Sequence, residues 1–177
     1  MPRKTKPMLM RERQTLVYSR ELFVRAPAER VFAVVKGIGG ERGWLFANFL
    51  WRWRARMDEW TGGIGMMRRR RDPDELRVGD VVDFWRVQEF QPNRFLRLRA
   101  EMKLPGRAWL QFHVEPAEHG ALLRSEALFK PDGILGDLYW GLLYPIHVFL
   151  FSGMLRAIAA QAEGGTGVLA ARATTET

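Results

Sequence analysis

Residues 138–155, LYWGLLYPIHVFLFSGML, decide the fold, because these eighteen residues contain only two strongly polar side chains, His147 and Ser152. A helix of this length reaches about 27 Å, at the short limit for crossing a hydrocarbon core of about 30 Å. Pro145 removes one backbone donor near the middle and favours a kink there. The segment therefore either spans a membrane or covers the apolar face of a sheet.

The composition is that of one domain. The chain has 177 residues, of which 47% are hydrophobic, so it is long enough to bury one sizeable core. It contains no cysteine, which excludes a disulfide framework and thiolate chemistry. The first residues lack the apolar run and cleavage site of a secretory signal, so we expect a cytoplasmic protein.

The net charge of +8 raises the question of an anionic partner. Half of this excess falls in residues 1–14, and most of the basic residues are arginine. We expect a solvated basic surface and no nucleic-acid partner, and the alternative is a patch that binds an anionic membrane or a nucleic acid.

The first part of the chain predicts a strand followed by two helices. Residues 15–25 alternate as a strand does, and Pro27 begins a helix. A glycine-rich connector over 37–43 follows, and a second helix is expected over 44–60. Its apolar residues recur at helical spacing and predict a buried face. That face consists of Phe46, Phe49, Leu50, Trp53, Met57 and Trp60.

The period then changes to two, which indicates an antiparallel meander. Strands are predicted over 65–71, 80–90, 95–104, 108–116 and 121–130, and a terminal helix over 135–161. We therefore expect an α+β domain over residues 15–162 with about six strands, a basic disordered tail over 1–14 and a disordered tail over 163–177. The apolar sheet face needs a cover, and 138–155 is the long apolar element left to supply it.

Several motifs, in the same order, resemble the DUF2867 family from residue 17 to residue 162. They are GDVVDFWRV at 79–87, AEMKLPG at 100–106, Ala108, Leu110, Phe112, Gly136, Tyr139-Trp140, Pro145, His147 and FSGM at 151–154. The resemblance implies a START or Bet v 1 type of helix-grip fold. In this fold a curved antiparallel sheet wraps a long terminal helix around a hydrophobic cavity.

The resemblance says little about activity. Family members often follow an NAD(P)-binding domain, which is absent before residue 17, so redox activity is not carried over. A separate NAD(P)-binding protein is instead an expected candidate partner. Four consecutive arginines at 68–71 stand where the family resemblance implies a glycine, and their role is left open.

We expect the ligand site between the concave sheet face and the terminal helix. The polar candidates are Asp83 and Trp85, placed on one strand face, while Arg86 points away and pairs with Glu101. His147 lies on one helix face with Tyr144 and Phe151 and either meets a ligand or, as a core residue, bonds to a backbone carbonyl or to a carboxylate such as Glu101. The apolar candidates are Leu98, Ala100, Met102, Leu110 and Phe112.

We therefore expect a non-enzymatic protein that binds a hydrophobic small molecule, with no cofactor and no metal. The alternative is a cyclase or dehydratase that uses His147, Asp83 or Glu101 as an acid or base. A further alternative is a membrane-associated protein that uses residues 138–155.

Overall fold

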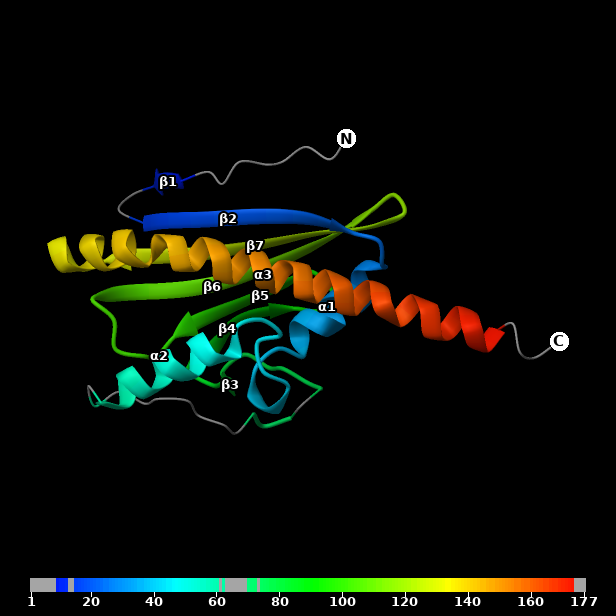
Figure 1. Cartoon of the computed structure of the whole chain (residues 1–177), viewed down its shortest axis with the longest axis horizontal. Coiled ribbons are helices and arrows are strands. Elements are labelled where there is room, and N and C mark those ends of the chain that lie inside the picture. The colour runs from blue at the N-terminus through cyan, green and yellow to red at the C-terminus, as the bar shows by residue number, and fades with distance from the viewer. Residues whose placement is uncertain (1–8, 13–14, 61, 63–69, 73, 174–177) are drawn as a thin grey trace.

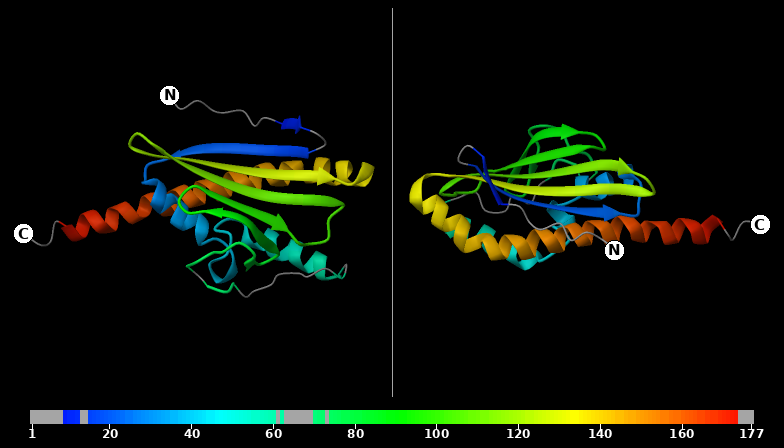
Figure 2. Two further views of the ribbon diagram at one scale, coloured as in Figure 1. Left: turned by 180° about the vertical axis from the view of Figure 1, so that it is seen from behind. Right: turned by 90° about the horizontal axis from the view of Figure 1, so that it is seen from above.

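The computed structural model describes residues 9–12, 15–60, 62, 70–72 and 74–173. In this part of the chain seven antiparallel strands form one sheet, and three α-helices lie on the same face of it (Figures 1 and 2). The predicted α+β architecture, a curved antiparallel sheet with a long terminal helix, is confirmed.

The sheet has the order β1-β2-β7-β6-β5-β4-β3. Its strands are β1 (Leu9–Glu12), β2 (Thr15–Val24), β3 (Val81–Val82), β4 (Trp85–Gln91), β5 (Phe95–Ala100), β6 (Gly106–Ala117) and β7 (Gly120–Pro131). The helices are α1 (Ala28–Lys36), the one-turn η1 (Gly40–Arg42), α2 (Asn48–Trp60) and α3 (Gly133–Ala173). Strands β3 to β7 follow one another as hairpins, as their short connections predict.

Both predicted tails contain regular structure. β1 falls in the stretch expected to be disordered. It pairs with the edge of β2 that does not face β7, and Leu9 lies opposite Tyr18. α3 continues beyond residue 162 to Ala173. The last residues of this helix, VLAARA at 168–173, are mostly strong helix formers, which explains the extension. The predicted strand over 65–71 lies mainly outside the described residues, and Arg70 and Arg71 are not in a strand.

α3 is the core helix of the domain. It is long and apolar enough to cross a membrane, with a mean hydropathy of 1.5, and 44% of its most apolar stretch of 18 residues is buried. The helix packs against the sheet and α1, so the segment 138–155 covers the sheet. The buried apolar residues in the middle of α3 include Leu150, Phe151, Met154, Leu155, Ile158 and Ala162.

α1 fills one end of the space between the sheet and α3. Its residues Val31, Phe32 and Val35 are fully buried, and the helix contacts β6, β7 and α3. Leu98 and Phe112 of the sheet are also fully buried. This end of the domain is therefore a filled core, and room for a ligand has to lie at the other end.

The predicted buried face of α2 is wrong. Trp53 and Trp60 lie on that face and are 57% and 91% exposed. Among the side chains of α2 that the structure describes, the buried ones are Trp51 and Ala55. Trp51 stacks on Trp44 with ring centroids 4.7 Å apart, and this contact turns the predicted apolar stripe outward. Helical periodicity identified the stripe correctly, but the choice of the inward face depends on the tertiary contact of Trp51.

Candidate functional site

Asp83 interrupts the strand that was predicted over 80–90. Its φ of 56° is left-handed, and Val82 pairs with Trp85, so Asp83 and Phe84 form the turn between β3 and β4. The buried carboxylate accepts hydrogen bonds from the backbone N–H of Gly40 at 3.1 Å and from the Nε1–H of Trp44 at 2.8 Å. Burial raises the pKa of Asp83. The residue therefore anchors the glycine-rich connector and does not share a face with Trp85.

Arg70 holds the same connector from the other side. Its guanidinium donates to the carbonyl oxygens of Lys36 at 2.7 Å and Ile38 at 2.9 Å. Burial lowers the pKa of Arg70. Of the four consecutive arginines, Arg70 thus has a structural role, Arg71 pairs with Asp80, and residues 68 and 69 lie outside the described residues.

Substitution of Asp83 separates the charge of this anchor from its hydrogen bonds. The pKa of Asp83 is raised on folding, so wild-type stability falls as pH rises through the interval between the unfolded and folded values. Asp83→Asn keeps an acceptor oxygen and tolerates the left-handed turn. We expect it to equal or exceed the wild type in stability at neutral pH and to lose this advantage in acid.

The control for that experiment is Asp83→Ala, which leaves two buried N–H donors unpaired. It is expected to cost about 2–6 kcal/mol, at about 1–3 kcal/mol for each of the two donors. Urea denaturation at neutral and acidic pH measures both variants. A strongly destabilised Asn variant at neutral pH would show that the charge itself holds the connector.

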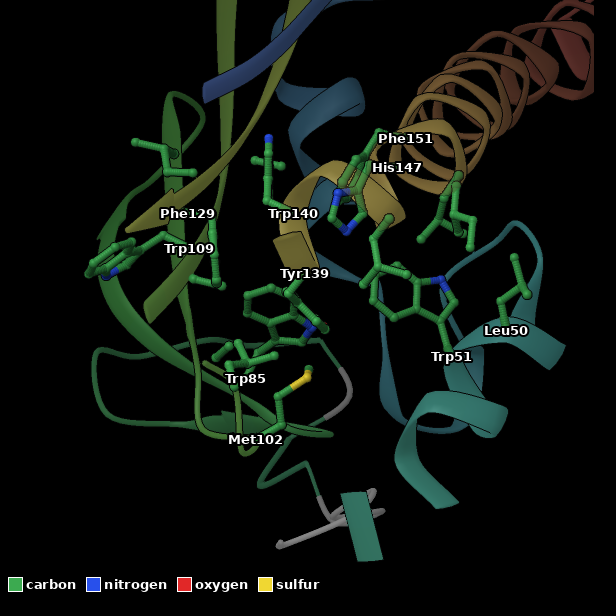
Figure 3. Close-up of a pocket in the computed structure, with 18 of the residues that line it drawn as sticks. Leu50, Trp51, Trp85, Met102, Trp109, Phe129, Tyr139, Trp140, His147 and Phe151 are labelled. Carbon is green, nitrogen blue, oxygen red and sulfur yellow. The ribbon is translucent and has the colours of Figure 1, made fainter. Parts of the chain in front are cut away.

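A cavity of about 130 Å³ lies at the end of the sheet that α1 does not fill. Its walls come from α2, from the neighbouring ends of β4 to β7 and from the first half of α3, and they are almost entirely apolar (Figure 3). The lining residues are Leu50, Trp51, Trp53, Trp85, Ala100, Met102, Leu104, Ala108, Trp109, Ala127, Leu128, Phe129, Tyr139, Trp140, Leu143, Ile146, His147, Leu150 and Phe151.

Half of the predicted ligand residues line this cavity. They are Trp85, Ala100, Met102, His147 and Phe151. The other half lie elsewhere, namely Asp83, Leu98, Leu110, Phe112 and Tyr144. The three apolar sheet residues among them are fully buried in the hydrophobic core, while Tyr144 packs edge-on against Tyr18 with ring centroids 6.0 Å apart. Asp83 is held in its turn by the two hydrogen bonds described above.

His147 lies in the cavity wall between two aromatic rings. Its ring centroid is 4.8 Å from that of Trp140 and 5.7 Å from that of Phe151. Burial lowers the pKa of His147 to about 4, so the imidazole is neutral at neutral pH. Glu101, which was expected as its acceptor in a core arrangement, instead forms the predicted cross-strand pair with Arg86. The core interpretation of His147 with that partner is wrong.

Several ring nitrogens of the wall are buried without a hydrogen-bond partner among the described residues. These are the indole nitrogens of Trp51, Trp85 and Trp140 and Nδ1 of His147. The indole nitrogen of Trp109 is unpaired as well, but alternation along β6 places this ring on the outer face of the sheet, under the guanidinium of Arg97 at 5.6 Å. More than about 90% of buried polar groups in proteins are paired. A wall with three unpaired indole donors is therefore suited to a ligand that carries an acceptor.

The wall contains residues that sequence reasoning missed. Leu50 and Trp53 of α2 were predicted on a buried helix face, Trp51 was not singled out, and nothing in their spacing indicates a cavity. Tyr139 and Trp140 were noted as part of a motif, and their position in the first half of α3 was the available signal. The described residues contain no cluster of His, Asp and Glu that could hold a metal ion.

Comparison with known proteins gives a family and a fold. The model of a family described as "Protein of unknown function (DUF2867)" matches residues 14–154, in agreement with the resemblance noted in the sequence. No curated protein matches the chain.

Three solved structures show the fold. The di-domain ARO/CYC StfQ from the steffimycin biosynthetic pathway has a TM-score of 0.54 at 14% identity, over 87% of this chain and 52% of that one. A norcoclaurine synthase point mutant of Thalictrum flavum has a TM-score of 0.53 at 13% identity, over 86% and 96%. The polyketide cyclase-like protein Cgl2372 of Corynebacterium glutamicum has a TM-score of 0.51 at 17% identity, over 89% and 96%. These likenesses confirm the helix-grip fold.

Proposed function

We propose that this chain, which belongs to the DUF2867 family, is a binding protein for a small aromatic molecule that carries a hydrogen-bond acceptor such as a carbonyl oxygen. The observation that carries the proposal is the cavity of about 130 Å³, whose aromatic wall contains three unpaired indole N–H groups. An engineered apolar cavity of about 150 Å³ is large enough for benzene. The cavity, which is slightly smaller, therefore has room for about one aromatic ring.

The polar groups supply the selectivity. A buried donor left without a partner costs about 1–3 kcal/mol, and a carbonyl oxygen of the ligand removes that cost. Burial of the apolar part of the ligand contributes about 25 cal/mol for each Å² removed from water. Affinity thus comes mainly from the aromatic surface, and orientation comes from Trp51, Trp85 or Trp140.

A binding role fits the wall better than acid–base catalysis. Among the lining residues, only His147 and Tyr139 carry ionisable side chains. A catalytic base works best when its pKa lies near the working pH, whereas burial lowers the pKa of His147 to about 4. The other two candidates, Asp83 and Glu101, lie outside the wall and are engaged elsewhere. A cyclase or dehydratase activity is therefore the second candidate, with His147 as its only base.

The proposal also covers the cellular compartment and a candidate protein partner. The absence of cysteine fits a reducing compartment, and we place the protein in the cytoplasm. A separate NAD(P)-binding protein is a candidate partner by family resemblance, and co-purification of the tagged full chain tests it.

The test uses acetophenone and α-methylstyrene, which have the same shape and differ in a carbonyl oxygen. We expect both to bind weakly, and we expect only acetophenone to move the indole N–H resonances of one or more of Trp51, Trp85 and Trp140 in the way a new hydrogen bond does. Trp44 is the internal control, because its Nε1–H already donates to Asp83. Equal responses to both probes would refute selection by an acceptor.

A volume variant tests the cavity itself. Ala100→Phe fills much of the space between the sheet and α3, and we expect it to weaken the binding of both probes by about 100-fold or more while costing about 1–3 kcal/mol of stability. Ala160→Phe is the matched control, because residue 160 is exposed on α3 outside the wall. Unchanged binding in the Ala100 variant would refute the cavity as the site.

A further inference from the structure

Gly153 leaves a notch in α3 that the ring of Phe46 fills. A Cβ atom at position 153 would overlap three atoms of this ring, so the ring rests directly on the backbone of α3. Its centroid also lies 5.1 Å from that of Phe149. Glycine is unfavourable in a helix interior, and Gly153 is one residue of the FSGM motif at 151–154 that ligand binding leaves without a role. The contact with Phe46 supplies a reason for glycine at this position.

The segment that carries Phe46 has a strained backbone. Leu45 and Ala47, on either side of Phe46, have left-handed φ angles of 61° and 49°, which residues with a Cβ atom seldom adopt. Such a backbone persists only where the surrounding contacts over-determine it. Here two contacts hold it, namely the hydrogen bond from Nε1 of Trp44 to Asp83 and the Phe46 ring in the notch. The position of Phe46 is therefore imposed by tertiary contacts and not by local preference.

The notch lies next to the cavity on both helices. Leu50 in the first turn of α2 lines the cavity, and so does Leu150, which precedes Gly153 by about one turn of α3. The start of α2 lies beside the middle of α3 (Figure 1). The depth to which the Phe46 ring sinks into α3 thus affects how closely the two helices approach each other at the cavity wall.

We propose that the Phe46 ring in the Gly153 notch holds α2 against α3 and thereby limits the cavity to a ligand of about one aromatic ring. The proposal rests on the proposed function and names the residues that set the size of its ligand. A side chain at position 153 expels the ring, and the first turn of α2 then moves away from α3. Truncation of Phe46 removes the same contact from the other side.

The first measurement is amide hydrogen exchange of the full chain without any ligand. Gly153→Ala and Phe46→Ala are expected to speed exchange in residues 48–60 by about tenfold or more, because α2 loses its contact with α3. Gly141→Ala is the matched control, since residue 141 lies in the same helix and a Cβ atom there meets nothing within 4 Å. We expect it to leave exchange in α2 unchanged.

The second measurement compares acetophenone with 2-acetylnaphthalene, which carries the same acetyl group on two fused rings. We expect the wild type and Gly141→Ala to prefer acetophenone. Gly153→Ala and Phe46→Ala are expected to shift the ratio of the two affinities toward the larger probe by about tenfold or more. The double variant is expected to match Phe46→Ala alone, because the methyl group at position 153 then has no ring to displace.

Three results would overturn the proposal. These are exchange in α2 that both variants leave unchanged, a ratio of affinities that neither variant moves, and a double variant in which the two effects simply add. A wild type that binds neither probe would overturn the proposed function, and the size limit with it. Since the exchange measurement needs no ligand, failure of the notch and failure of ligand binding are distinguishable.

Discussion

Trp44→Ala is expected to lower the free energy of unfolding by about 4–6 kcal/mol. Trp44 is fully buried and stacks on Trp51, and replacing a buried tryptophan by alanine costs about 3–5 kcal/mol. The substitution also removes one of the two donors to the buried carboxylate of Asp83, at about 1 kcal/mol more. Because domains of this kind are stable by about 5–15 kcal/mol, the variant approaches the limit of folding.

Urea denaturation followed by circular dichroism measures this loss. Trp44→Phe keeps an aromatic ring and removes only the N–H donor, and we expect it to cost about 1–3 kcal/mol. Trp53→Ala is the control on the exposed side of α2 and is expected to change stability by less than about 0.5 kcal/mol. If Trp44→Ala were as mild as Trp53→Ala, the stacked cluster would not hold α2 to the sheet.

The sheet and the terminal helix could be predicted because their sequences carry regular periods. β5 alternates Leu96 and Leu98 with Arg97 and Arg99, and this pattern places one apolar face on the helices and one charged face toward solvent. β5 to β7 were joined by recognisable turn residues, so the meander followed from sequence alone. A local pattern of this kind needs no knowledge of distant contacts.

Asp83 and α2 could not be placed, because tertiary contacts decide both. Val81, Val82, Phe84 and Trp85 look like one continuous strand, but the carboxylate of Asp83 gains two hydrogen-bond donors only when the chain turns there. In α2 the exposed stripe is more apolar than the buried side, and the contacts of Trp51 with Trp44 and Phe84 fix the orientation. The usual rule for choosing the buried face therefore gives the wrong answer here.

The site was half predictable for a related reason. Alternation identifies which residues face the helices, and both Ala100 and Leu98 satisfy it. It cannot tell where along the strand the covering helix ends. Leu98 is fully buried in the core, whereas Ala100, two residues further along the same strand face, lines the cavity. Which of the two meets an open space depends on the elements that cover each point of the strand.

His147 is expected to make the protein sensitive to acid, with a loss of about 3 kcal/mol between pH 6.5 and pH 4. Burial lowers the pKa of its imidazole from 6.5 to about 4 in the folded state. Between these values the unfolded chain binds a proton that the folded chain does not, so acid favours unfolding. Stability from this residue is fully present above pH 6.5 and is lost as pH falls toward the folded pKa.

The measurement is the difference in free energy of unfolding between the wild type and His147→Phe, from about pH 7 to pH 4.5. The carboxyl of Glu126, whose pKa is lowered by its bond to His113, contributes its own acid dependence and cancels in the difference. We expect the wild type to lose stability relative to His147→Phe as pH falls, by about 1.4 kcal/mol for each pH unit in the steep region. Parallel curves would mean that the imidazole has the same pKa in the folded and unfolded chains, so that burial in the cavity wall does not keep it neutral in acid.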